Sequence, residues 1–121
     1  MIDLAGHVWA DGDLQPLAAD EPYQGLRRVM IDGRAATLAR YDFGPGAKFP
    51  LHRHPQEQLT LVVAGSVSAI VDGHHVSLHA GQGFVARADE SHGVEAGPDG
   101  AILVAVIAPA RTAPPEVLAG S

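Results

Sequence analysis

Short apolar segments separated by turn signals follow one another along most of the chain. The segments are rich in Val, Ile, Leu and Phe, and no window is long enough to favour a helix. Short strands with closely spaced turns are typical of an all-β sandwich or barrel. The pattern predicts strands at 26–31, 34–43, 47–53, 58–64, 66–71, 75–79, 83–87, 92–96 and 101–108.

The turn signals predict where strands are joined and how the chain is divided. Asp72-Gly73, between two alternating runs, predicts a type I′ hairpin, because this turn needs positive φ at both central residues. Gly65-Ser66 and 97–100 predict two further turns between strands. A chain of 121 residues is expected to form one domain. We divide it into an N-terminal arm at 1–22, a barrel at 23–111 and an extended or frayed tail at 112–121.

Composition narrows the classes of protein. Because the chain has no cysteine, thiol catalysis, cysteine zinc sites and disulfides are excluded, and a reducing cytoplasm is favoured. A net charge of −6 with Lys48 as the single lysine argues against nucleic-acid binding. The N-terminus lacks the pattern of a signal peptide, and the longest apolar stretch, 101–110, is too short for a membrane span. We expect a cytoplasmic protein that acts on a small molecule.

Two segments contain the histidines that are candidate metal ligands. In the first, alternation on a strand places His52 and His54 on one face and Arg53 on the other. Two such imidazoles can bind one ion, although they can equally be polar residues at a strand edge. In the second, a strand runs into a polar turn that ends at His92, and a single histidine there is usually solvated. Neither segment alone distinguishes a metal site from ordinary polar histidines.

Together the two segments resemble the paired motifs of the cupin family over residues 35–108. The first motif reads Gly46, five residues, His52-Arg53-His54, three residues, Gln58, six residues, Gly65. The second reads Gly81, five residues, Arg87-Ala88-Asp89, two residues, His92, three residues, Ala96. The spacing matches throughout, whereas the family's residue types are replaced at Gln58, Arg87, Asp89 and Ala96. The resemblance implies a single-domain double-stranded β-helix, also called a jelly-roll barrel, and a homodimer formed through edge strands.

The resemblance also implies one divalent metal ion held by His52, His54, Gln58 and His92. Zinc, nickel, manganese, iron and copper all accept such ligands. The family has glutamate where this chain has Gln58, and a neutral amide leaves the ion near its full charge of about +2. Such a centre is a stronger Lewis acid and lacks the carboxylate of iron oxygenases, so non-redox chemistry is favoured. Alternation places Glu57 on the opposite face.

Cupin subfamilies with glutamine at this position include single-domain polyketide cyclases and the cupins that linearise 4,5-unsaturated uronates in pectin degradation. The latter carry an aspartate, a phenylalanine and an arginine at the positions of Ala105, Ile107 and Arg111. Loss of the aspartate argues against uronate linearisation. The best candidates for acid–base and substrate-binding groups are Tyr41, on the strand before the first motif, and Arg111, whose guanidinium suits a carboxylate.

The leading hypothesis is a metal-dependent isomerase, lyase or cyclase that acts on a small oxygenated molecule, with the ion stabilising an enolate-like intermediate. A metal-dependent dioxygenase and a non-catalytic small-molecule-binding protein remain open as alternatives. The other histidines are expected elsewhere: His74, His75 and His79 at the surface, and His7, with Trp9, closing either a barrel mouth or a contact with a dimer partner.

Overall fold

The computed structural model describes residues 18–111 and 115–118, which form antiparallel strands joined by turns. The strands are β1 (Ala18–Tyr23), β2 (Leu26–Asp32), β3 (Thr37–Phe43), β4 (Lys48–Arg53), β5 (Glu57–Val71), β6 (His74–His79), β7 (Gly83–Ala86), β8 (His92–Ala108) and β9 (Glu116–Val117). No helix that could cross a membrane occurs in these residues. The all-β fold predicted from the sequence is confirmed.

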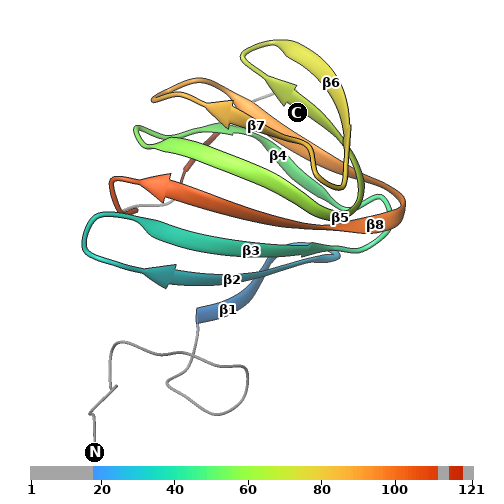
Figure 1. Ribbon diagram of the computed structural model, residues 1–121, viewed down its shortest axis with the longest axis horizontal. Helices are drawn as coiled ribbons and strands as arrows, with labels where there is room; N and C mark the ends of the chain where they lie inside the picture. The colour runs from blue at the N-terminus through green and yellow to red at the C-terminus, as the bar shows by residue number, and fades with distance from the viewer. Residues whose placement is uncertain (1–17, 112–114, 119–121) are drawn as a thin grey trace, which may run out of the picture.

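Two long strands, β5 and β8, hold the barrel together (Figure 1). They pair along almost their full length, from Glu57 opposite Ala108 to Val71 opposite His92. The second half of β8 also pairs with β3, and its first half pairs with β4. The first half of β5 pairs with β7 and the second half with β6. Each long strand therefore passes from one side of the curled sheet to the other, as in a jelly-roll barrel.

The turns predicted at Gly65-Ser66 and 97–100 are wrong, because β5 and β8 continue through both segments. The register instead shifts there, between Val62 and Ala64 and between Gly65 and Val67. Gly65 has a φ of 76°, and a Cβ at this position would lie 2.1 Å from the carbonyl oxygen of Gly100. The glycine therefore marks a bulge where two backbones approach closely, which the sequence pattern does not distinguish from a turn.

The ends of the described chain extend the barrel. Strand β1 pairs with β2, so the expected arm boundary at residue 22 falls inside a strand. Strand β9, within the expected tail, pairs with β4, and its Glu116 forms an ion pair with Arg53 at 3.0 Å. Strand β1 contains Asp20, Glu21 and Pro22, which are unfavourable in strands, and β9 has two residues, so neither carries a strong strand signal. The hairpin at Asp72-Gly73 is confirmed, with φ values of 48° and 80°.

Alternation along the strands sends one set of side chains into the barrel, where aromatic rings gather at the end of the core nearest the histidines. The ring of Phe49 on β4 lies 5.9 Å from Tyr41 on β3 and 5.1 Å from Tyr23, between centroids. On its other side, Phe49 lies 4.3 Å from the imidazole of His52. The apolar core therefore borders directly on the polar cluster described next.

Candidate metal centre

Three strands bring the four predicted metal ligands to one place inside the barrel. His52 lies near the end of β4, opposite His92 at the start of β8, and His54 follows β4 directly. Gln58 is the second residue of β5. The side chains retain 4%, 1%, 8% and 6% exposure respectively, so all four are buried. Candidate ligand atoms of the three histidines all lie within 4.8 Å of one another, so they could hold a metal ion.

Backbone carbonyls fix the tautomer of each imidazole. The Nδ1 atoms lie 2.7 Å from the oxygen of Pro50 for His52, 3.0 Å from Gln56 for His54 and 3.1 Å from Glu90 for His92. A carbonyl oxygen can only accept, so each neutral ring carries its proton on Nδ1 and donates it. Each Nε2 then keeps its lone pair, which is the arrangement of metal-binding histidines in general.

The side chain of Gln58 completes the set of donor atoms. Its Nε2 donates to Oγ1 of Thr60 at 2.9 Å, which turns Oε1 toward the imidazoles. Oε1 lies 3.0 Å from Nε2 of His54 and 3.2 Å from Nε2 of His92. With the protons on Nδ1, these converging atoms are all acceptors, and buried acceptors need a positive partner. The residues present therefore fit a divalent cation.

Burial keeps two of the imidazoles neutral. It lowers the pKa of His52 to about 3, and the nearby charge of a protonated His92 acts in the same direction. Burial also lowers the pKa of His92 to about 4, although the hydrogen bond to the carbonyl of Glu90 opposes it. Both rings are therefore neutral at pH 7, with Nε2 unprotonated, as a metal ligand must be.

Two small cavities border the imidazoles. One, of about 20 Å³, is lined by His52, Gln58 and His92 together with apolar core residues. The other, of about 10 Å³, reaches from His52, His54 and Gln58 to Tyr41, Arg28 and Arg111. Each has room for about one water molecule. The second cavity joins the histidines to the two candidates named from the sequence, Tyr41 and Arg111.

Different interactions act on Tyr41, Arg28 and Arg111. Burial raises the pKa of Tyr41, while the charges of Arg28 and Arg111 act in the opposite direction. Arg28 donates to both carboxylate oxygens of Asp20, at 3.0 and 2.6 Å. The backbone nitrogen of Arg111 donates to Oγ1 of Thr37 at 3.0 Å, which anchors this residue beside β3. A phenol that keeps its proton therefore borders the same small cavity as the two arginines.

Sequence reasoning did not identify Arg28 as a site residue. Its signal was present, because Arg28 stands between the buried Leu26 and Met30 in the alternation of β2 and so shares their inward side. Glu57 is exposed on the face opposite Gln58, as alternation predicts. His74, His75 and His79 are exposed, also as predicted. His7 and Trp9 lie outside the described residues.

Two positions where the chain departs from the family motifs, and one where it departs from the uronate cupins, have simple structural roles. Arg87 is exposed. Asp89 replaces a glycine and has a φ of 62°, a backbone conformation that aspartate tolerates better than most residues. Ala105 is buried and pairs with Thr60, so no carboxylate occupies this position beside the residue that holds Gln58.

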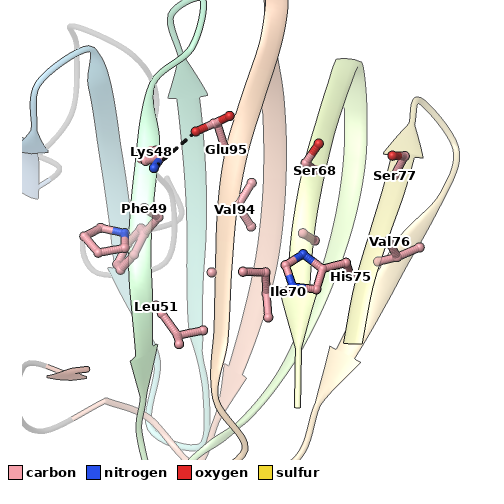
Figure 2. Close-up of a pocket in the computed structure, with 13 residues that line it drawn as sticks. Lys48, Phe49, Leu51, Ser68, Ile70, His75, Val76, Ser77, Val94 and Glu95 are labelled. Carbon is pink, nitrogen blue, oxygen red and sulfur yellow. Dashed lines mark ion pairs between the residues drawn. The ribbon is translucent and has the colours of Figure 1, made fainter. Parts of the chain in front are cut away.

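Larger hollows among the described residues lie on the outside of the sheet. One groove, of about 340 Å³, lies over β4, β8, β5 and β6. Figure 2 shows the residues that line it. Leu51, Ile70 and Val76 supply apolar side chains there, and an ion pair at 3.3 Å joins Lys48 to Glu95 at one end. None of His52, His54 and His92 lines this groove, so it is separate from the candidate metal centre.

Comparison with known proteins identifies the relatives of this chain. The family model described as a cupin domain matches residues 39–107. The dimethylsulfoniopropionate lyase DddW of Ruegeria pomeroyi is 33% identical over 98 residues, which cover 74% of this chain and 64% of the lyase. The pectin degradation protein KdgF of Dickeya dadantii is 31% identical over 94 residues, covering 76% of this chain and 86% of KdgF. This chain thus spans less than two thirds of the length of DddW.

Solved structures show the same architecture. The crystal structure of an RmlC-like cupin from Shewanella frigidimarina superposes with a TM-score of 0.77 at 28% identity, covering 87% of this chain and 92% of that one. The predicted jelly-roll barrel is thereby confirmed.

Proposed function

Because the chain belongs to the cupin family, we propose that it is a metal-dependent enzyme with lyase, isomerase or cyclase activity. Its substrate is a small oxygenated molecule that bears a carboxylate, and the reaction does not change the oxidation state of the metal. One observation carries the proposal: three Nε2 lone pairs and one amide oxygen converge in a buried cluster that, among the residues the structure describes, includes no carboxylate.

The neutral donor set distinguishes this centre from one that contains glutamate. His52, His54, His92 and Gln58 would hold the ion, which supplies Lewis acidity toward substrate oxygens when bound. Because none of these donors carries a charge, an anionic group of the substrate is attracted to the site. Arg111 adds a second attraction for a carboxylate, which its guanidinium can bind through two parallel hydrogen bonds.

Tyr41 is the best candidate for moving a proton. Its ring is buried, lies on the inner face of β3 and borders the same small cavity as the histidines. Burial raises the pKa of Tyr41, so the phenol is protonated at neutral pH and can donate its proton. The apolar side chains of Phe49 and Ile107 line the cavity around it and keep bulk water away.

The relatives support this class of chemistry. One is named a lyase for dimethylsulfoniopropionate, a carboxylate, and the other a pectin degradation protein. Uronate linearisation itself is not part of the proposal, because Ala105 has no acid–base group and the adjacent Thr60 is occupied with Gln58. Tyr41 then takes the place of an aspartate as the proton-transferring group.

The experiment combines metal analysis with turnover. Purified protein and a His52→Ala variant are analysed for bound metal, and protein loaded with zinc or with ferrous iron is then offered a panel of small carboxylates. Elimination or isomerisation with zinc, which is redox-inactive, supports the proposal. Oxygen uptake that requires both iron and substrate would instead indicate a dioxygenase. Substrate binding without any turnover under either loading would indicate a binding protein.

A further inference from the structure

The last described segment of the chain lies against the candidate metal centre. Pro115 borders the small cavity that also reaches His52, Tyr41 and Arg28. The other walls of this cavity come from β2, β3, β4, β5 and β8, or from residues that follow β4 and β8 closely. Residues 115–118, which we call the strap, therefore supply a wall that lies outside the main barrel strands.

The strap lies where two barrel strands are not joined to each other. Strand β4 pairs with β8 on one side and with β9, which belongs to the strap, on the other. Across the cavity, Arg28 and Met30 belong to β2, whose partners are β1 and β3. Within residues 18–111 and 115–118, no backbone pairing connects β2 with β4. Pro115, which borders the same cavity, thus lies at the opening between these two strands.

The backbone of the strap has a short attachment to the barrel. Strand β9 pairs only with the last two residues of β4, His52 and Arg53. One step further, the backbone nitrogen of Leu118 donates to the carbonyl oxygen of Leu51 at 2.8 Å. The side chain of Val117 remains 51% exposed, so its packing buries little apolar surface. Segments with few buried contacts open at a much lower free-energy cost than core strands do.

One ion pair fixes the position of the strap. Arg53 donates from Nε and Nη2 to the two carboxylate oxygens of Glu116, at 3.0 and 3.2 Å. Both side chains are exposed, so this pair adds little stability, although its two parallel hydrogen bonds define one geometry. Arg53 stands between His52 and His54 in the sequence, and alternation turns it to the outside. The segment that offers metal ligands on one face therefore holds the strap with the other.

The cavities beside the histidines are too small for a substrate while the strap is in place. They measure about 20 and 10 Å³, and each has room for about one water molecule. Even a small carboxylate is several times larger, so part of the wall must move before it can reach the ion. Of the described strands, β9 has the fewest register pairs, which makes the strap the part of the wall that separates most readily.

We propose that the strap is a gate: metal ions and substrates enter and leave the candidate metal centre when residues 115–118 separate from β4. The inference rests on the proposed function in that a substrate has to reach the ion. In its closed position the strap keeps bulk water from the site. The ligands stay oriented when it opens, because His52 donates to the carbonyl oxygen of Pro50 in its own strand at 2.7 Å. Opening therefore controls the rates of entry and exit and leaves the affinity for metal unchanged.

A reversible disulfide across the strap tests the proposal on the full-length chain. In an Arg53→Cys/Glu116→Cys variant the two cysteines are register partners, at a separation that suits a disulfide, and the chain has no other cysteine. Stopped-flow mixing with zinc, and with a coloured chelator, measures zinc binding and release. Both rates should be at least about 10-fold lower in the oxidised than in the reduced variant, because the strap can no longer open. The dissociation constant for zinc should be equal in the two forms.

Each variant has a matched control. Ser68→Cys/Ser77→Cys places a disulfide between exposed register partners on β5 and β6, and its oxidation should leave zinc exchange unchanged. Glu116→Lys tests the strap without cysteines: it replaces the ion pair by repulsion and should speed zinc exchange by roughly 3-fold or more. Glu95→Lys makes the same change in charge at the exposed ion pair with Lys48 and should exchange zinc like the wild type.

The outcomes separate the gate from the proposed enzyme. Equal zinc exchange in the oxidised and reduced forms of the Arg53→Cys/Glu116→Cys variant would overturn the gate. So would a disulfide that changes the affinity for zinc and leaves the rate of binding as it was, because the strap would then only support β4. Gated zinc exchange in a protein that turns over no carboxylate would contradict the proposed function and leave the gate standing. A protein that binds no zinc would contradict both.

Discussion

Gln58 and Thr60 face the interior from the same side of β5, and the amide Nε2 of Gln58 donates to Oγ1 of Thr60 at 2.9 Å. An amide has two chemically different ends, and rotating it by half a turn would present two N–H groups to the imidazoles in place of the oxygen. Thr60 therefore determines which end of Gln58 faces His54 and His92.

Removing that hydroxyl should weaken metal binding. In a Thr60→Val variant the shape of the side chain is nearly kept, but the amide loses its orienting partner. We expect the affinity for zinc to fall by roughly 10- to 100-fold, the usual effect of losing a group that orients a metal ligand. Competition with a coloured chelator measures this. Thr60→Ser, which keeps the hydroxyl, should bind like the wild type, and equal affinity of all three proteins would contradict the role of Thr60.

A carboxylate at position 58 should have the opposite effect. In Gln58→Glu the ligand carries a negative charge, so we expect tighter zinc binding, by roughly tenfold or more. The same charge weakens the Lewis acid, and turnover of a carboxylate substrate should therefore fall. The matched control is Glu57→Gln, which makes the reverse change on the exposed face of the same strand. A similar effect of both substitutions would show that net charge, and not ligation, is responsible.

Arg111 is expected to act in substrate binding. Once a substrate is identified, Arg111→Ala should raise KM by roughly 10-fold or more while bound metal stays unchanged, because a charge-assisted hydrogen bond is lost. Arg87→Ala removes an exposed arginine on the outside of the barrel and serves as the control. A fall in kcat at constant KM would contradict carboxylate binding by Arg111.

The metal-free protein should lose stability as the pH falls. The pKa values of His52 and His92 are lowered to about 3 and about 4 in the folded state, against 6.5 in an unfolded chain. Between these values the unfolded chain binds more protons, so protonation favours unfolding. Stability is therefore fully present above about pH 6.5 and declines as the pH falls toward 4.

Urea denaturation of chelator-treated protein at pH 7.5, 6 and 5 checks this dependence. The midpoint should decrease across the series in the wild type and decrease less in a His52→Gln variant, which has one fewer group to protonate. An equal decrease in both proteins would assign the pH dependence to other residues.

Much of the site could be predicted because short local rules place its parts. Strict alternation puts His52 and His54 on one face and separates Glu57 from Gln58. The spacing of the two motifs then brings His92 to the same place through the pairing of β4 with β8. Arg28 was missed because a charged residue belongs to no motif here, although the alternation of β2 places it on the inward side with Leu26 and Met30.

The fold was harder to predict where the backbones of two strands approach each other closely. Gly65 has the local pattern of a turn, and only the approach of Gly100 from β8 shows why glycine is needed. The orienting role of Thr60 likewise depends on a contact between side chains that alternation alone does not specify. Neither feature defines a substrate, because the cavities beside the histidines, of about 20 and 10 Å³, each have room for about one water molecule.

The bulge at Gly65 has one more consequence, which concerns strand register. A slip of β5 by one residue would exchange its two faces and bring Glu57 among the imidazoles in place of Gln58. The bulge resists such a slip, because any other residue moved to this position would collide with the backbone of Gly100. Gly65, seven residues after Gln58 on β5, thus keeps the neutral amide of Gln58, and not the carboxylate of Glu57, beside the histidines. In the proposed metal centre, the Lewis acidity that a neutral ligand confers would therefore depend on the close approach of two backbones at Gly65.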